Sequence, residues 1–156
     1  MEYLIIKWLH IISATLLFGT GLGSAFYRYL ADRDKDIHTI YVTNKNVVIA
    51  DWIFTTPTVI LQPVTGIAML FYSQYTITEP WVMVSLCLFI LAGLCWLPVV
   101  YLQIRLRDIA FEALQAGSDL PDKYYRFARI WFLLGIPAFI SVMCVFLLMV
   151  IKPGWG

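Results

Sequence analysis

Charged side chains are scarce in this sequence. Asp, Glu, Lys and Arg make up 13% of its 156 residues, whereas hydrophobic residues make up 61%. This balance is far from that of an ordinary soluble domain and is typical of a membrane protein. The formal net charge of +1 gives no electrostatic basis for binding nucleic acid. We therefore expect an integral membrane protein whose surroundings are the lipid bilayer.

Cysteine and histidine are also rare. The three cysteines, Cys87, Cys95 and Cys144, lie in apolar stretches and form no CxxC pair. They therefore provide neither a disulfide framework nor a thiolate metal site. Only two histidines occur, His10 within an apolar stretch and His38 within a polar segment.

Four apolar stretches are each about as long as the ~20 residues that a helix needs to cross a bilayer. They cover about residues 3–27, 52–72, 81–103 and 130–151. The fold class predicted is all-α, an antiparallel bundle of four transmembrane helices in a single domain over residues 1–156. We expect residues 32–51 to form a surface turn that leads into the second span, and residues 104–129 to extend spans three and four as a helical hairpin. Gly117 would end the first arm of that hairpin, and Pro121 suits the first turn of the second.

The basic residues are distributed unevenly along the chain. Nine of the eleven lie in segments 28–51 and 104–129, and the other two are Lys7 and Lys152. The positive-inside rule assigns the two basic segments to the cytoplasm, which places both termini outside. Trp155 would then belong to the outer aromatic belt. A cleavable signal peptide is the competing interpretation of the N-terminus, although the positive charges follow the first span instead of preceding it.

The face of the first helix that carries His10 points into the bundle. Steps of three and four residues from Lys7 collect small, apolar and basic side chains on that face, namely His10, Ala14, Leu17, Gly21, Ser24 and Arg28. Small residues allow close contact between membrane helices. An ionisable group at membrane depth usually faces the bundle interior and suggests a function.

A neutral imidazole in a helical bundle can ligate a metal or relay a proton. The predicted spans 52–72, 81–103 and 130–151 contain no Asp or Glu, which favours ligation of haem iron over proton transfer. The simpler alternative is a structural hydrogen bond to Gln62 or Thr65. A sixth haem ligand would come from Met69 or Met143, and a five-coordinate haem is equally consistent. Lys7, one turn nearer the outer surface, would pair with the haem propionates, although it is equally expected to reach the lipid headgroups.

The opening of the chain resembles a known family. Residues 7–14 (KWLHIISA), followed by Phe18 and Gly19, are similar to the first helix of HemJ-type protoporphyrinogen oxidases, and more broadly to the copper-resistance protein D group. Members of the first family are four-helix membrane proteins that bind haem b through a histidine in this setting. The resemblance implies haem b ligated by His10 and, if the chain is an enzyme, an oxidoreductase.

The whole chain resembles a bacterial family of predicted integral membrane proteins of unknown function. The similar segments are residues 62–66, 96–103, 135–139 and 149–153. This resemblance implies a multi-pass protein of the bacterial inner membrane.

Two functions of different classes follow from the sequence. The first is a haem b protein in membrane redox chemistry or electron transfer, with a quinone as a conceivable partner. The alternative is a cofactor-free accessory or assembly subunit of a larger membrane complex. The Gly19-x-x-x-Gly23 pair also fits a homo-oligomer contact or internal packing.

Overall fold

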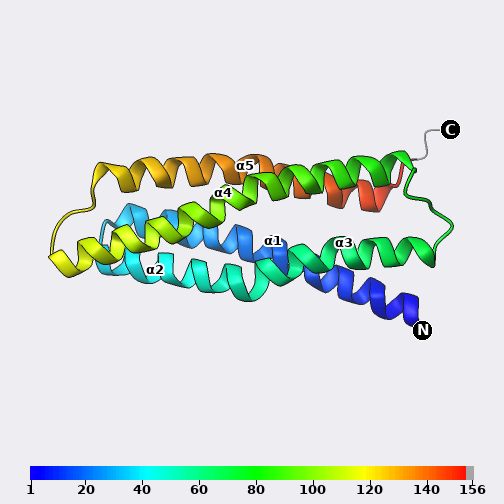
Figure 1. Cartoon of the computed structure of the whole chain (residues 1–156), viewed down its shortest axis with the longest axis horizontal. Coiled ribbons are helices and arrows are strands. Elements are labelled where there is room, and N and C mark those ends of the chain that lie inside the picture. The colour runs from blue at the N-terminus through cyan, green and yellow to red at the C-terminus, as the bar shows by residue number, and fades with distance from the viewer. Residues whose placement is uncertain (154–156) are drawn as a thin grey trace.

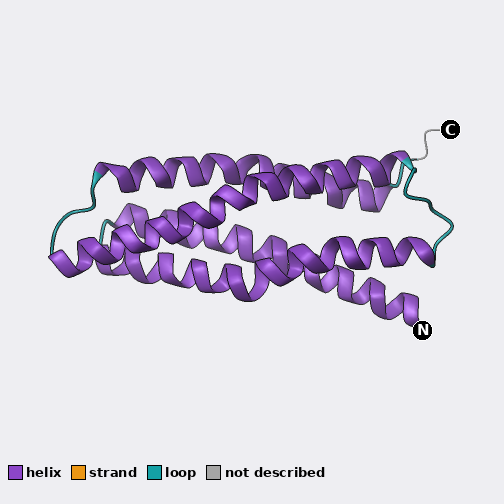
Figure 2. Ribbon diagram, in the orientation of Figure 1, coloured by secondary structure: helices purple, strands orange, loops and turns teal. Residues whose placement is uncertain are grey.

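The structure, a computed structural model, describes residues 1–153, which form a bundle of long antiparallel helices (Figure 1). The elements are α1 (Glu2–Asp34), α2 (Ile37–Ala50), the π-helical turn η1 (Asp51–Thr55), α3 (Thr56–Phe71), α4 (Pro80–Ala116) and α5 (Asp122–Ile151). Helices joined by short connections account for residues 1–153, with no strand among them (Figure 2). Within this part of the chain, four helical segments are long and apolar enough to cross a membrane. The predicted all-α fold is therefore confirmed, whereas Trp155 lies outside the described residues.

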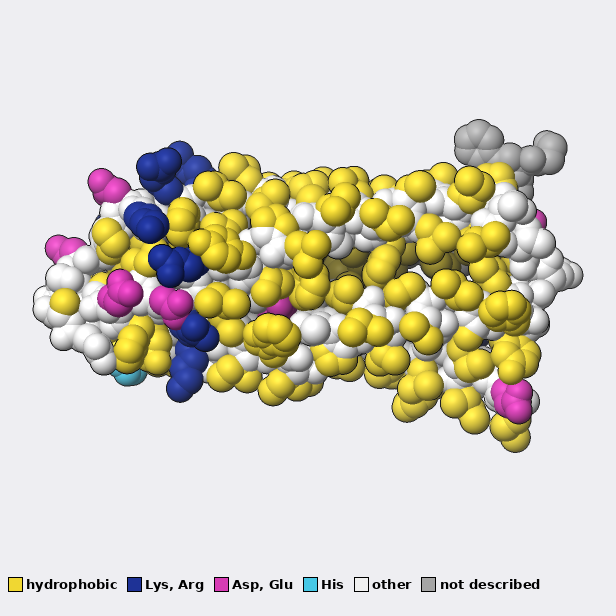
Figure 3. Space-filling model, viewed as in Figure 1, with side chains coloured by type: hydrophobic (Ala, Val, Ile, Leu, Met, Phe, Trp, Pro, Cys, Tyr) yellow, Lys and Arg dark blue, Asp and Glu magenta, His cyan; other side chains and the backbone are white. Residues whose placement is uncertain are grey.

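The N-terminus and the end of α5 lie at the same end of the bundle (Figure 1). Lys and Arg side chains gather in a band near the opposite end, on the face seen in Figure 3. We call the first the terminal end and the second the basic end. The placement of the basic end in the cytoplasm stays a prediction from the positive-inside rule.

The expectation of a surface turn over residues 32–51 is wrong, because almost all of this segment is helical. Helix α1 continues to Asp34, and Lys35 adopts a left-handed conformation with φ of 59° that ends it. Asp36 then caps α2 by accepting a hydrogen bond from the Thr39 amide at 2.8 Å. Hydrogen bonds from the Thr39 hydroxyl and amide lower the pKa of the Asp36 carboxyl. Two residues and one capping side chain therefore replace the predicted turn.

Helices α2 and α3 form one long rod through η1. Pro57 is the second residue of α3; it has no N–H, and its ring crowds the carbonyl four residues earlier, that of Ile53. The turn is wider there, since the Thr56 amide bonds the carbonyl of Asp51 five residues back. The rod is thus continuous across the proline, and the second membrane-crossing helix begins at Ile37 instead of near Trp52.

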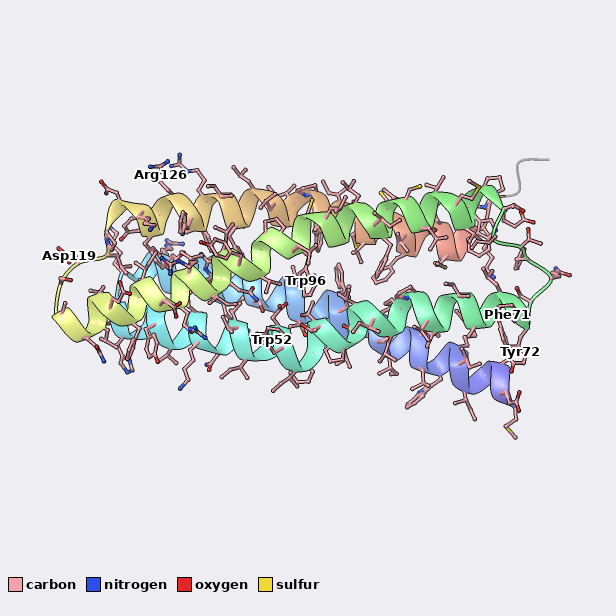
Figure 4. The ribbon with its side chains drawn as sticks, in the orientation of Figure 1. Trp52, Phe71, Tyr72, Trp96, Asp119 and Arg126 are labelled. Carbon is pink, nitrogen blue, oxygen red and sulfur yellow. The ribbon has the colours of Figure 1, made fainter. Side chains whose placement is uncertain are left out.

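Helices α4 and α5 form the predicted helical hairpin. Gly117 follows α4 with φ of 60°, a left-handed conformation that glycine adopts without strain and that ends the helix as expected. Pro121 is the capping residue before α5 and not part of its first turn. Asp119 in the connection and Arg126 on α5 lie at the basic end, far from Phe71 and Tyr72 at the terminal end (Figure 4).

The tightest packing lies toward the basic end, where α1, α2, α4 and α5 meet. Its centre is Tyr124, whose hydroxyl donates to Asp32 at 2.6 Å and accepts from the Asn44 amide at 2.9 Å. The buried side chains packed together there are Ala31, Ile40, Leu102, Leu106, Ile109, Ala110, Tyr124 and Trp131. This core fixes the relative position of the helices, which then separate toward the terminal end.

Candidate cofactor site

Toward the terminal end the helices form two pairs, α1 with α3 and α4 with α5 (Figure 1). A cavity of about 540 Å³ lies between the pairs, and we call it the outer cavity. Its volume falls within the ~300–1,000 Å³ of small-molecule sites. Apolar side chains supply most of its walls, including Ile11, Ala14, Ile67 and Leu70 from one pair and Leu86, Phe89, Val145 and Phe146 from the other.

His10 lines the outer cavity from α1, and its ring is held by α3. The imidazole Nδ1 lies 2.8 Å from the Thr65 hydroxyl oxygen. That hydroxyl donates its proton to the carbonyl of Leu61 at 2.6 Å, so its oxygen accepts the hydrogen bond from Nδ1–H. The proton of the neutral imidazole is thereby fixed on Nδ1, and the lone pair is on Nε2. Within residues 1–153, Nε2 has no hydrogen-bond partner.

The close approach of α1 to α3 depends on Gly66 and Gln62. A Cβ added at Gly66 would lie 3.5 Å from Cε1 of His10, so the ring rests directly against the α3 backbone. The Gln62 side-chain amide donates to the His10 carbonyl at 2.9 Å and to the Ser13 hydroxyl at 2.5 Å. These contacts hold α1 in register with α3, so that His10 and Thr65 lie opposite each other. The hydrogen bond of His10 to Thr65, the simpler alternative drawn from the sequence, is present, and it leaves Nε2 without a hydrogen-bond partner among the described residues.

Lys7 and Lys152 both line the outer cavity, from α1 and from the end of α5. The ammonium group of Lys152 lies 5.0 Å from the ring centre of Tyr75 and 5.7 Å from that of Trp81. Such cation–π contacts hold the charge beside the cavity. Lys7, which the sequence analysis names as a partner for propionates, and Lys152 therefore line the same cavity as His10.

The methionines divide into two groups. Met69 on α3 lines the outer cavity together with His10, whereas Met143 on α5 has 45% of its surface exposed and is absent from the wall. The prediction that Met143 is a candidate haem ligand is therefore not supported by its position. Met149, one and a half turns further along α5, lines the cavity from the pair of helices that faces His10. The sequence predicts only how deep each methionine lies in the membrane, and by depth Met143 is near His10. It does not predict which side of α5 faces the cavity.

The arrangement can hold a planar, largely apolar group that needs one nitrogen ligand. Within the described residues, no three His, Cys, Asp or Glu side chains form a cluster that could hold a bare metal ion. A single imidazole in an apolar cavity is instead the ligand set of a cofactor that brings its own remaining ligands, as a porphyrin does. Thr65 acts on the tautomer and orientation of His10, as the partners of metal-binding histidines usually do.

Three polar residues that the sequence places outside the spans are buried, namely Arg28, Asn44 and Asp51. Asp51 has 8% of its surface exposed and lines a second cavity nearer the basic end. Hydropathy starts the second span near Trp52, which leaves Asp51 in the predicted surface turn, whereas the helix begins at Ile37. Steps of three and four residues from Thr65 back through Gln62, Thr58 and Thr55 lead to Asp51, and this stripe is the signal that would have found it.

Comparison with known proteins places the chain in a family. Residues 4–153 match the model of a family described as predicted integral membrane protein (DUF2269). No curated protein and no solved structure matches the chain, so similarity to the HemJ-type oxidases and to the copper-resistance protein D group stays a prediction. Since the matched segment covers nearly the full length, the chain belongs to this DUF2269 family of predicted integral membrane proteins.

Proposed function

We propose that this membrane protein binds haem b in the outer cavity through Nε2 of His10 and takes part in membrane redox chemistry or electron transfer, with a membrane quinone as redox partner. The observation that supports the proposal is the hydrogen bonding of the His10 ring. Its Nδ1 is occupied by Thr65 and its Nε2 is free beside an apolar cavity. The haem would supply one-electron chemistry at its iron.

The residues present fit the cofactor. The cavity volume of about 540 Å³ suits a small molecule, and its walls are chiefly apolar. Lys7 and Lys152 offer positive charge for two propionates near the terminal end. Met69 or Met149 would be the sixth ligand if the iron is six-coordinate.

The resemblance of residues 7–14 to HemJ-type proteins supports haem binding more than it supports their reaction. Those proteins usually place a further polar or basic residue beside a tryptophan on the third helix. Here Trp81 is followed by Val82, Met83 and Val84, and the Ser85 hydroxyl donates to the carbonyl of Trp81 at 2.7 Å. Porphyrinogen oxidation is for this reason not part of the proposal.

The test is the visible spectrum of the protein purified in mild detergent. We expect a Soret band and a pyridine haemochrome typical of haem b, both lost in His10→Ala. The matched control is His38→Ala, because His38 is the other histidine of the chain and is exposed on the first turn of α2. A band that survives in His10→Ala would refute the assignment. A colourless protein that co-purifies with another membrane chain would instead support the accessory-subunit alternative.

A further inference from the structure

A second cavity, which we call the inner cavity, lies between the outer cavity and the basic end. It has a volume of about 380 Å³ and is lined by α1, the α2–η1–α3 rod, α4 and α5. Phe89 on α4 lines both cavities, so the two are neighbours. Figure 3 shows the face of the molecule hollowed between rows of hydrophobic side chains. Aromatic side chains are frequent in the wall: Phe18, Phe89, Trp96, Trp131, Phe132 and Phe139.

Three side chains of this mostly apolar wall carry a buried polar atom without a hydrogen-bond partner among the described residues. Asp51, Gln103 and Trp131 line the inner cavity and are 8%, 2% and 8% exposed. Oδ2 of Asp51, Nε2 of Gln103 and Nε1 of Trp131 are buried and have no hydrogen-bond partner among the described residues. The other oxygen of Asp51 accepts a single bond, from Nε1 of Trp96 at 3.2 Å. Trp96 lies at mid-length of the bundle, in the region where these helices meet (Figure 4).

Unpaired polar atoms at such positions are unusual. Each buried group without a partner costs about 1–3 kcal/mol, and an acidic group inside a membrane protein suggests a function. The wall combines an acceptor, the Asp51 carboxylate, with donors, the Trp131 indole and the Gln103 amide. An occupant that satisfies them must offer both a hydroxyl donor and an oxygen acceptor on an otherwise apolar, flat ring.

The charges of the site narrow the choice of occupant. A lipid phosphate or a fatty-acid carboxylate would meet the Asp51 carboxylate in the same cavity, which opposes binding of an anion. The buried guanidinium of Arg28 lies behind the Trp131 ring, 4.3 Å from its centre, is 3.9 Å from Asp32, and is not part of the wall. A metal cation would find one carboxylate and no cluster of further ligands in the described residues. A neutral head group with two oxygens on opposite sides of a flat six-membered ring meets neither obstacle.

We propose that the inner cavity binds the head group of a membrane quinone, in both its quinone and its hydroquinone form. The choice of a quinone as ligand rests on the proposed function. The choice of binding site rests on the polar atoms and shape of the inner cavity. A quinone carbonyl accepts a hydrogen bond from Nε1 of Trp131 or from the Gln103 amide. In the hydroquinone, one hydroxyl donates to Oδ2 of Asp51. The aromatic wall stacks against the ring.

The depth of the site suits this ligand. Asp51 precedes Thr65 by fourteen residues on the α2–η1–α3 rod, which corresponds to about 21 Å along the axis at ~1.5 Å per residue. Since Thr65 contacts His10, Asp51 lies about that far inward from His10. With the basic end in the cytoplasm, as the positive-inside rule predicts, the polar end of the inner cavity lies toward the inner surface of the membrane, and the isoprenoid tail of the quinone stays in lipid.

The test is equilibrium binding of ubiquinone and menaquinone carrying one isoprene unit, in oxidised and reduced form, measured by quenching of tryptophan fluorescence in mild detergent. Gly93→Leu and Gly135→Leu each place a side chain in the inner cavity, and a Cβ at either position meets nothing within 4 Å. We expect each variant to weaken binding at least about tenfold. The matched control is Gly19→Leu, which lies on the exposed face of α1 and lines neither cavity; its affinity should stay within about threefold of the wild-type value.

A second variant probes the carboxylate. Asp51→Asn keeps the shape of the side chain and replaces a charged acceptor by a neutral one, and charged hydrogen bonds are roughly twice as strong. We expect about a tenfold loss of hydroquinone affinity and about threefold or less for the quinone. Equal affinities of both forms for Asp51→Asn and the wild type would overturn the role of Asp51.

Two further measurements keep the inference independent of variant folding and of haem. Photolabelling of the wild-type protein with an azidoquinone should mark peptides around Trp96 and Phe139; labels confined to residues 3–11 and 145–150 would place the quinone in the outer cavity and overturn the inference. The Soret band is recorded on the same sample. Quinone binding without a Soret band would refute only the haem proposal, whereas a Soret band without quinone binding would refute only the inner site.

Discussion

The most informative single substitution is Thr65→Val, because it tests whether Thr65 sets the state of His10. Valine has nearly the shape of threonine, so the change removes the hydroxyl that faces Nδ1 of His10 at 2.8 Å and leaves the packing of the buried position intact. The imidazole loses the acceptor that keeps its proton on Nδ1. The effect of Thr65→Val on the free energy of unfolding should therefore differ in size from its effect on cofactor affinity.

The stability effect should be small. A buried N–H left without a partner costs about 1–3 kcal/mol, but hydrogen bonds between membrane helices average only about 0.6 kcal/mol in double-mutant cycles. The lower figure should apply here, since His10 lines a cavity and can move its proton to Nε2. We expect a loss of about 1 kcal/mol in the free energy of unfolding, measured by SDS titration of the protein in mixed micelles.

The effect on haem should be larger. Loss of the partner that orients a metal-binding histidine typically reduces metal affinity about 10–100-fold. Haem titration into the apoprotein, followed by the Soret absorbance, should show a weakening in this range for Thr65→Val. The same change in affinity would correspond to about 1.4–2.7 kcal/mol, more than the expected stability loss.

The control is Thr58→Val on the same helix. Thr58 is also buried, but its hydroxyl donates only to the carbonyls of Phe54 and Thr55 in its own rod. It should lose a similar amount of stability and no haem affinity. Equal haem affinities of Thr65→Val and Thr58→Val, with the Soret band intact in both, would refute the conclusion that Thr65 orients the ligand.

Three further outcomes are expected. Lys7→Met should lower the haem midpoint potential in a redox titration by the equivalent of at most about 1 kcal/mol, because Lys7 is exposed and its charge is screened; an unchanged potential and occupancy would mean that the propionates point elsewhere. Tyr124→Phe should cost about 1–3 kcal/mol in thermal unfolding, since Asp32 loses its donor in the core, while exposed Tyr125→Phe should change stability by less than about 0.5 kcal/mol. A periplasmic reporter enzyme fused after residue 156 should be active outside, and activity only in the cytoplasm would contradict the predicted orientation.

The class of fold could be predicted from the sequence because hydrophobic stretches and helix-ending residues act locally. The apolar stretches gave the membrane helices, and Gly117 correctly marked the end of α4. The connection between the first two spans could not be predicted in the same way. There a two-residue link with Asp36 as cap replaces a turn, and the helix continues across Pro57 through η1. Both features depend on hydrogen bonds that hydropathy does not describe.

Part of the site could also be predicted, because it depends on positions along a single helix. His10 and Lys7 share one face of one helix, so the α-helical period alone places them together. The choice between Met69, Met143 and Met149 depends on how α3 and α5 are rotated about their axes relative to α1. That rotation is fixed by packing between helices, and the sequence pattern does not give it. Met143 was therefore favoured by depth although its side chain faces away from the outer cavity.

The polar stripe of the α2–η1–α3 rod connects the two proposals. Gln62 and Thr65 of this stripe form hydrogen bonds with α1. Asn44, two turns before Asp51 on the same rod, donates a hydrogen bond to Tyr124 on α5. These are neutral groups whose bonds join helices. Asp51 is the carboxylate of the stripe, and it is more costly to bury than an amide or hydroxyl. A single bond from an indole at 3.2 Å compensates little of that cost, and asparagine would give the same packing with less penalty. A carboxylate at such a position, beside a cavity and at the start of a π-helical turn of the kind often found at functional sites, is better explained by a ligand that bonds its second oxygen than by the stability of the bundle.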